Sequence, residues 1–222
     1  MRGRLVVFEG GEGVGKSTQL LRLASRLAAA GVAHKTYREP GGTAAGDRIR
    51  DLLLHGDAPL APATEAALFI ASRAQLVATA VRPALALGEH VLLDRFLLST
   101  YAYQMHGRGL PEADLRAANH LATGGLVPDL TLLFQLPAAV GLERAGARGG
   151  ADRMERADAA FHERVEAAFA SFATDAWQAA HPECGRIAAV SAAGDASVVA
   201  ERVAAAIARE CPALLEPQGA GA

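Results

Sequence analysis

Residues 5–17, LVVFEGGEGVGKS, decide the fold. They begin as an apolar run typical of a buried strand and continue as residues 10–17, which match the pattern G-x-x-x-x-G-K-[ST]. Leu20, Leu23 and Leu27 then recur on one face of a predicted helix. Strand, glycine-rich loop and helix in this order predict a phosphate-binding loop, because loop amides and the helix N-terminus can surround phosphate oxygens.

This loop predicts a site for a nucleoside triphosphate. Lys16 can reach the β- and γ-phosphates, and Ser17 can ligate Mg²⁺. The alternative interpretation is a glycine-rich turn with an exposed lysine. The predicted ATP-binding residues are Gly10, Gly11, Glu12, Gly13, Val14, Gly15, Lys16, Ser17 and Thr18.

Short apolar runs alternate with longer helical patterns along the chain, which is typical of a parallel sheet covered by helices on both faces. We expect strands over residues 5–9, 34–38, 90–94, 130–136 and 186–191. We expect helices over residues 17–30, 62–87, 113–123, 137–147, 158–180 and 196–210. Pro83 predicts a kink or break near the end of the second helix. The expected fold is therefore an α/β fold with a five-stranded parallel sheet, in one domain over residues 1–215 with a flexible tail over 216–222.

The composition argues against several other classes of protein. The 22 basic and 24 acidic residues give a net charge of −2, unlike a protein that coats nucleic acid or an anionic membrane. The apolar runs are far shorter than the roughly 18 residues of a membrane span, and no secretory segment precedes the first strand. Cys184 and Cys211 form no metal-ligand spacing and fit a reducing compartment. We expect a cytoplasmic protein with no nucleic-acid or membrane partner.

The third predicted strand ends in LLDR, residues 92–95. Asp94 is placed to hold Mg²⁺ through water, and Arg95 to extend beyond the γ-phosphate. An arginine is useful there if the acceptor is itself a phosphate, because one guanidinium can bind donor and acceptor oxygens together. A surface Asp–Arg turn is the alternative. The sequence contains no NKxD motif of the kind that GTPases use to bind the base.

Four segments together resemble the thymidylate kinase family of nucleoside monophosphate kinases. They are EGGEGVGKS at 9–17, REPGGT at 38–43, DRFLLSTYAYQ at 94–104 and the arginine-rich stretch 144–155. The resemblance extends from residue 5 to about residue 170. It implies a P-loop kinase fold, transfer of a phosphoryl group from ATP to dTMP with Mg²⁺ in dTTP biosynthesis, and a homodimer. A kinase for another nucleoside monophosphate, or a nucleotide-binding protein without turnover, is the alternative.

The resemblance also implies an acceptor site. Arg50 would hold the dTMP phosphate with Arg38 and Arg95 nearby, although Arg50 taken alone is more typical of a solvated helix face. Pro40 would belong to the wall of the site. The implied acceptor-binding residues are Glu12, Arg38, Pro40, Arg50, Phe69, Arg73, Arg95, Ser99, Tyr103 and Gln104.

The base and sugar contacts come from the same resemblance. Phe69 and Arg73 stand four residues apart, so both can lie on one side of a helix. Phe69 would stack on thymine, although a helical phenylalanine is more often core, and Arg73 would donate to thymine O4. Tyr103 would crowd the sugar C2′ position and Gln104 would line the base or sugar region. Glu12 would contact the 3′-hydroxyl or a water bound to Mg²⁺.

Residues 141–155, GLERAGARGGADRME, join two predicted helices. Gly146, Gly149 and Gly150 would allow this segment to move as a lid. Phosphoryl transfer needs positive charge over the migrating group and exclusion of water. Because the P-loop carries no arginine, the lid must supply these cations, as in the bacterial subclass of the family. The predicted catalytic residues are Lys16, Arg95, Arg148 and Arg153, with Arg144 a further candidate.

Overall fold

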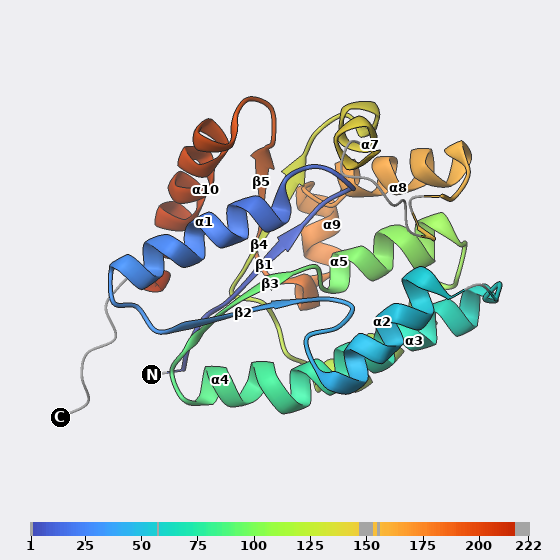
Figure 1. The fold of residues 1–222 in the computed structure, drawn as a ribbon, viewed down its shortest axis with the longest axis horizontal. Helices are drawn as coiled ribbons and strands as arrows, with labels where there is room; N and C mark the ends of the chain where they lie inside the picture. Colours follow the sequence, from blue (N-terminus) through green and yellow to red (C-terminus); the bar gives the residue numbers. More distant parts are fainter. Residues whose placement is uncertain (1, 57, 147–152, 155, 216–222) are drawn as a thin grey trace.

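A computed structural model of the chain describes residues 2–56, 58–146, 153–154 and 156–215. Its centre is a five-stranded parallel sheet with the strand order β2-β3-β1-β4-β5 (Figure 1). The strands are β1 (Leu5–Glu9), β2 (His34–Arg38), β3 (His90–Asp94), β4 (Leu130–Gln135) and β5 (Ile187–Ser191). The predicted fold class is therefore confirmed, and the five strands agree with the predicted ones to within one residue at each end. β2 is the polar strand because it lies at an edge of the sheet, where side chains reach solvent.

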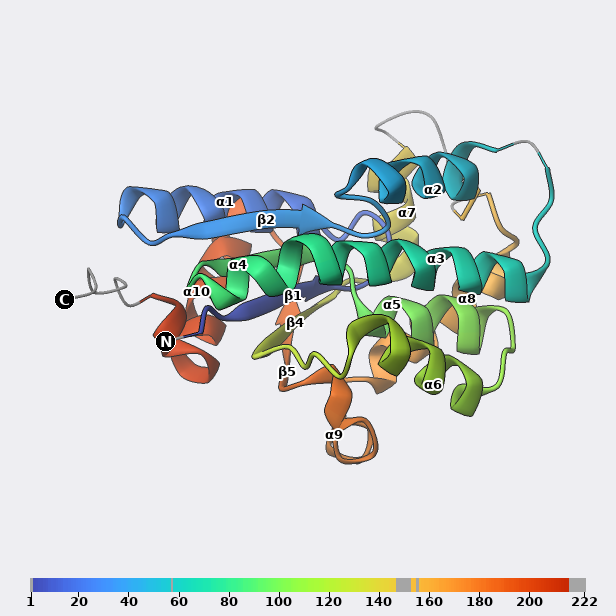
Figure 2. The same cartoon turned by 90° about the horizontal axis from the view of Figure 1, so that it is seen from below.

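Helices cover both faces of this sheet (Figures 1 and 2). The α-helices are α1 (Lys16–Ala29), α2 (Ala44–His55), α3 (Pro62–Leu76), α4 (Arg82–Ala86), α5 (Leu97–Thr100), α6 (Glu112–Thr123), α7 (Ala138–Gly146), α8 (Ala159–Ser171), α9 (Asp175–Ala180) and α10 (Ala196–Glu210). Two π-helical segments, η1 (Val77–Val81) and η2 (Tyr101–Gly107), and two short 3₁₀ turns, η3 (Pro182–Cys184) and η4 (Pro212–Leu214), complete the described elements. α1 and α10 pack on one face, and α3, η2 and α8 contribute to the core on the other.

The long helical stretch 62–87 contains the discontinuity that Pro83 predicts. α3 passes into η1, where the amide of Arg82 bonds to the carbonyl of Val77, five residues back. Pro83 follows directly in α4. A proline has no N–H to donate and its ring crowds the preceding turn, so a wide turn before it relieves the clash.

The single helix predicted over residues 158–180 is wrong. α8 ends at Ser171, and α9 begins after Thr174, whose hydroxyl accepts a hydrogen bond from the amide of Trp177 at 3.3 Å. Between them Phe172 is fully buried, so the chain turns into the core at this point. Alanine-rich sequence favours a helix on both sides but does not indicate where such a turn falls.

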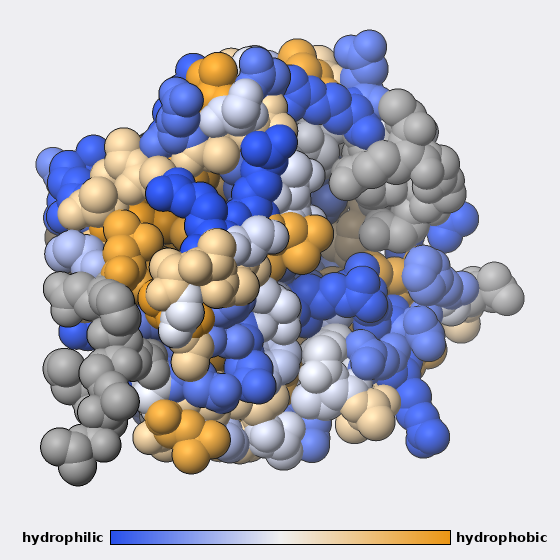
Figure 3. Space-filling model, turned by 60° about the vertical axis from the view of Figure 1, so that its left-hand side comes forward, coloured by the Kyte–Doolittle hydropathy of each residue, from blue (hydrophilic) through white to orange (hydrophobic). Residues whose placement is uncertain are grey.

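Most of the surface in Figure 3 is hydrophilic, and hydrophobic side chains form small separate groups on that face. The most exposed large apolar side chains of the described residues are Leu87 on the α4 end and Leu121 on α6. None of the described helices combines the length and the apolar content needed to cross a bilayer.

Candidate active site

The glycine-rich loop between β1 and α1 forms the predicted cradle. Gly10, Gly13 and Gly15 have φ angles of 137°, 66° and 88°, which side chains other than glycine rarely adopt. Lys16, the first residue of α1, is buried and donates from Nζ to the carbonyl oxygens of Gly10 (3.0 Å) and Gly11 (2.6 Å). Burial, together with the charge of Arg95, lowers the pKa of Lys16 to about 8. The ammonium group thus lies inside the loop that would surround the phosphates.

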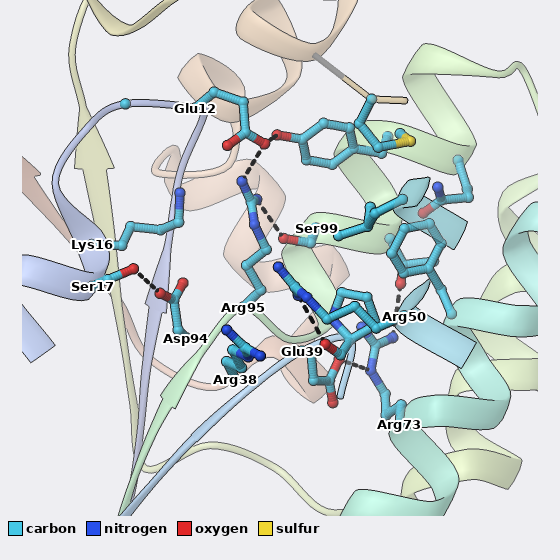
Figure 4. Close-up of a pocket in the computed structure, with 18 of the residues that line it drawn as sticks. Glu12, Lys16, Ser17, Arg38, Glu39, Arg50, Arg73, Asp94, Arg95 and Ser99 are labelled. Atoms are coloured by element: carbon cyan, nitrogen blue, oxygen red, sulfur yellow. Dashed lines mark hydrogen bonds and ion pairs between the residues drawn. The ribbon is translucent and has the colours of Figure 1, made fainter. Parts of the chain in front are cut away.

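Two oxygen ligands stand beside this loop. The Ser17 hydroxyl donates to Oδ2 of Asp94 at 2.5 Å, since β1 and β3 are neighbours and Phe8 pairs with Asp94 (Figure 4). Among the described residues no group of three or more His, Cys, Asp or Glu side chains could hold a metal. One hydroxyl and one carboxylate fit Mg²⁺, because this ion keeps several waters and takes further ligands from substrate phosphates.

Arg95 lies between the loop and the rest of the pocket. Its φ is 72°, and its amide donates to the Phe8 carbonyl at 3.0 Å, so the chain turns sharply at the end of β3. Its guanidinium donates to the Gly10 carbonyl (3.2 Å), the Ser99 hydroxyl (3.1 Å) and Oε1 of Glu12 (2.5 Å) (Figure 4). A guanidinium in this position can contact one anion in the phosphate-binding loop and another in the rest of the pocket.

Glu12 forms the centre of this polar group. The same Oε1 that binds Arg95 accepts the Tyr103 hydroxyl at 2.8 Å. Burial raises the pKa of Glu12, but the charges of Arg95 and Lys16 outweigh it and lower the pKa to about 2. Burial and the neighbouring Glu12 carboxylate raise the pKa of the Tyr103 phenol. Glu12 is therefore a carboxylate throughout the neutral range, and Tyr103 is its hydrogen-bond donor.

One cavity of about 310 Å³ joins the loop to the predicted acceptor residues. Lys16, Ser17 and Asp94 line it on one side. All of the predicted acceptor residues line it as well, namely Glu12, Arg38, Pro40, Arg50, Phe69, Arg73, Arg95, Ser99, Tyr103 and Gln104. The structure thus brings together residues from the loop after β1 and from α1, β2, α2, α3, β3, α5 and η2.

Arg73 is buried and makes several hydrogen bonds within the protein that the sequence does not indicate. Only 2% of it is exposed, and it donates to Glu39 (2.8 Å), Thr100 (2.7 Å), Asn119 (2.5 Å) and the Phe96 carbonyl (2.8 Å). Its Nη2 also lies 2.7 Å from the Glu39 carboxylate. These contacts are four hydrogen bonds and one ion pair, so most of its five N–H donors are used within the protein. Burial raises the pKa of Glu39, against the opposing effect of Arg73.

Sequence reasoning missed Glu39 and Asn119 as partners of Arg73. Glu39 belongs to the REPGGT segment, but nothing in the sequence links it to a helix that begins more than twenty residues later. The following peptide bond, Glu39–Pro40, is cis. The carbonyl of Pro40 accepts from Nη1 of Arg50 at 2.9 Å, which holds this predicted phosphate ligand over the turn.

The predicted lid is described in part. Arg148 lies outside the described residues. Arg153 does not line the cavity; it donates instead to the backbone carbonyls of Gly56 and Ala58, the latter at 2.9 Å. The next residue, Met154, is 5% exposed and does line the cavity. The structure therefore places the end of the lid against the segment after α2, where the Arg153 guanidinium binds backbone carbonyls.

The first part of the lid segment, in α7, lies directly on the phosphate-binding loop. A Cβ added at Gly141 would lie 2.4 Å from the Glu12 carbonyl oxygen, and one at Gly13 would lie 1.8 Å from the Gly141 carbonyl oxygen. Only glycine at both positions permits this approach. Arg144, further along α7, is exposed. Sequence reasoning treated Gly13 only as part of the loop and missed its contact with α7.

A family model described as thymidylate kinase matches residues 8–181, which is more than half of the chain. The chain belongs to the thymidylate kinase family. The curated thymidylate kinase of Synechococcus sp. strain JA-2-3B'a(2-13) is 50% identical to this chain over 198 residues. These residues cover 89% of this chain and 91% of the relative. The thymidylate kinase of Deinococcus radiodurans is 49% identical over 172 residues, 78% of this chain and 84% of that protein.

A solved structure agrees with this family membership. The crystal structure of thymidylate kinase from Ehrlichia chaffeensis matches with a TM-score of 0.71 and 25% sequence identity, covering 94% of this chain and all of that one. The fold of a thymidylate kinase and the cavity described above therefore occur in the same chain.

Proposed function

We propose that the chain is an enzyme that transfers the γ-phosphoryl group of ATP to dTMP, giving ADP and dTDP, a step of dTTP biosynthesis. Membership of the thymidylate kinase family supports this activity. The observation that carries it is that Lys16, the Ser17–Asp94 pair and the acceptor residues line one cavity, with Arg95 between them. Neither a kinase for another nucleotide nor a binding protein without turnover is favoured by the comparisons.

The donor side holds ATP. The loop amides and the Lys16 ammonium bind the β- and γ-phosphates, which takes Lys16 from the two carbonyls that it now contacts. Ser17 and Asp94 hold Mg²⁺, and the ion, when bound, neutralises charge on the phosphates. The acceptor phosphate of dTMP is already an oxyanion, so no general base is needed.

The acceptor side holds dTMP. Arg50 and Arg38 bind its phosphate, and Arg95 binds donor and acceptor oxygens together, which offsets their repulsion. Pro40 and Ser99 complete the wall. Phe69 stacks on thymine, since it lines the cavity and is only partly buried.

Tyr103 and Glu12 enclose the sugar. Tyr103 crowds C2′ and disfavours ribonucleotides, and Glu12 contacts the 3′ side. Support for this pairing is the 2.8 Å hydrogen bond between the two side chains at the wall of the cavity. Gln104 and Arg73 line the cavity beyond Tyr103 and face the base.

We extend the proposal to the lid, residues 141–155, within a single domain over 1–215. Its arginines, Arg148 and Arg153, supply charge to the transferring phosphoryl group when the lid closes. Arg153 must leave the carbonyls of Gly56 and Ala58 to do so. The chain works in the cytoplasm as a homodimer; the exposure of two large apolar side chains, Leu87 and Leu121, supports self-association.

A coupled ADP-release assay over dTMP, dUMP, dCMP, dGMP and AMP tests the function. We expect the highest kcat/KM for dTMP and a dependence on Mg²⁺. Arg95→Lys keeps the charge but not the two-sided contact, so kcat should fall at least tenfold. Tight dTMP binding without turnover, or a better substrate among the other nucleotides, would refute the proposal.

A further inference from the structure

Gln104 lines the cavity from η2, and a buried carboxylate holds its amide. Nε2 of Gln104 donates to Oε1 of Glu65 at 3.0 Å. Both side chains are about 2% exposed. Glu65 lies in the first turn of α3, and the proposed reaction gives it no role.

Arg108, just beyond the end of η2, fixes this carboxylate. Its Nε and Nη2 donate to Glu65 at 3.2 and 2.9 Å, one to each oxygen. Its guanidinium also lies over the ring of Phe161, 4.4 Å from the centroid. A two-point contact of this kind holds a carboxylate in one orientation.

The carboxylate in turn determines which end of the Gln104 amide is free. An ionised carboxylate accepts hydrogen bonds and donates none, so Gln104 must direct its NH₂ group at Glu65. The carbonyl oxygen of the amide then lies on the other side, and within the described part of the chain it has no hydrogen-bond partner. A side-chain amide without this neighbour could present either end.

We propose that Glu65, held by Arg108, is a positioning residue that makes Gln104 present an oxygen acceptor to the base of the acceptor nucleotide. This rests on the proposed use of a pyrimidine nucleotide as acceptor. Thymine carries an N–H at N3, which such an oxygen accepts, whereas cytosine has a bare nitrogen there and would face oxygen with a lone pair. The site rejects cytosine because the buried oxygen then has no donor.

Arg73 also lines the cavity, but protein acceptors hold its guanidinium in the structure. Its guanidinium donors make four hydrogen bonds to protein acceptors, among them Glu39 and Thr100, and Nη2 also forms an ion pair with Glu39. Using one of them on the base breaks a buried contact, which offsets the energy gained. We therefore assign recognition of N3 to Gln104, which Glu65 and Arg108 hold in place.

Glu65→Gln tests this inference. The new amide can donate to Gln104 or accept from it, so the orientation of Gln104 is no longer fixed. We expect the ratio of kcat/KM for dTMP to that for dCMP to fall about tenfold, the value of one buried hydrogen bond. An unchanged ratio, within twofold, would overturn the proposal.

Glu183→Gln is the matched control. Glu183 also binds an arginine, Arg116 at 2.8 Å, and also contacts η2, through the Tyr101 hydroxyl at 2.6 Å. It does not line the cavity. The control should keep the wild-type ratio; an equal loss in both variants would mean that loosening of η2 is the cause and would overturn the proposal.

A substrate change gives a second test that needs no folded variant. 3-Methyl-dTMP lacks the N3–H, and we expect wild-type enzyme to bind it at least tenfold more weakly than dTMP. Equal binding would overturn the inference. In Glu65→Gln the penalty for the methyl group should shrink; an identical penalty would count against Glu65. Loss of dTMP turnover by wild-type enzyme would instead refute the proposed function, so the two failures are distinct.

Discussion

Arg73→Met separates a structural role of this arginine from a role in binding dTMP. Methionine keeps much of the volume but removes the charge and every donor. In the structure these donors hold Glu39, Thr100 and Asn119, in addition to the Phe96 carbonyl. The substitution therefore leaves a carboxylate that is 5% exposed without its cation.

The size of the effect follows from this burial. Removing one partner of a buried ion pair costs about 3–5 kcal/mol, because the remaining charge is neither solvated nor paired. For a chain of this length 1 kcal/mol corresponds to about 2–4 °C in Tm, so the melting temperature should fall by roughly 6–20 °C. The raised pKa of Glu39 also predicts how this loss of stability depends on pH. As the pH falls, protonation of Glu39 removes the unpaired charge, so the difference in stability between wild type and variant should shrink at acidic pH.

Urea unfolding and calorimetry, with steady-state kinetics at a temperature where the variant is folded, measure both roles. The double variant Arg73→Met/Glu39→Gln should recover part of the stability, since a neutral amide is cheaper to bury than a lone carboxylate. A loss of stability below about 1 kcal/mol, combined with a large rise in KM for dTMP, would refute the structural account and favour Arg73 as a direct ligand of thymine.

Three further predictions concern the loop, the lid and α9. Gly141→Ala places a Cβ 2.4 Å from the Glu12 carbonyl, so KM for ATP should rise and stability should fall by about 1–3 kcal/mol. Gly146→Ala, whose Cβ meets nothing within 4 Å, should leave kinetics unchanged and gain up to about 1 kcal/mol; similar kinetics in both variants would contradict the contact. Because the pKa of Lys16 is about 8 and a triphosphate favours the charged amine, ATP affinity should fall as the pH rises above this value. Calorimetry at about pH 9 in two buffers should then show proton uptake on binding, and its absence would argue against a lowered pKa. Thr174→Ala removes the cap of α9 and should cost about 1 kcal/mol in thermal unfolding without changing kcat; a loss of activity would show a wider role.

Local sequence was informative where chemistry and geometry are local. The apolar runs of β1, β3 and β4 predicted strands buried on both faces, and the glycines of residues 10–15 predicted the loop, because each property depends on neighbouring residues alone. Asp94 and Arg95 were assigned to the site because they end a predicted strand, and the pairing of β1 with β3 then brings them to the loop. The assignment of the acceptor residues needed more than periodicity: it came from the family resemblance, and the shared cavity agrees with it.

Sequence was least informative where two distant segments meet. The break between α8 and α9 depends on the burial of Phe172, which no local propensity encodes. The placement of Arg153 on the backbone after α2 likewise depends on how the lid segment crosses the molecule. Neither feature has a signature in composition or spacing.

From its sequence alone this protein could be assigned a parallel α/β sheet, a phosphate-binding loop and the residue types needed to hold two phosphates. Tertiary structure decided which side chains meet: Glu39 with Arg73, Glu65 with Gln104, and Gly13 with Gly141. The physical reason is that strand and loop formation depends on short-range backbone preferences. The protonation, orientation and free donors of a buried side chain depend instead on neighbours that only the packed chain supplies.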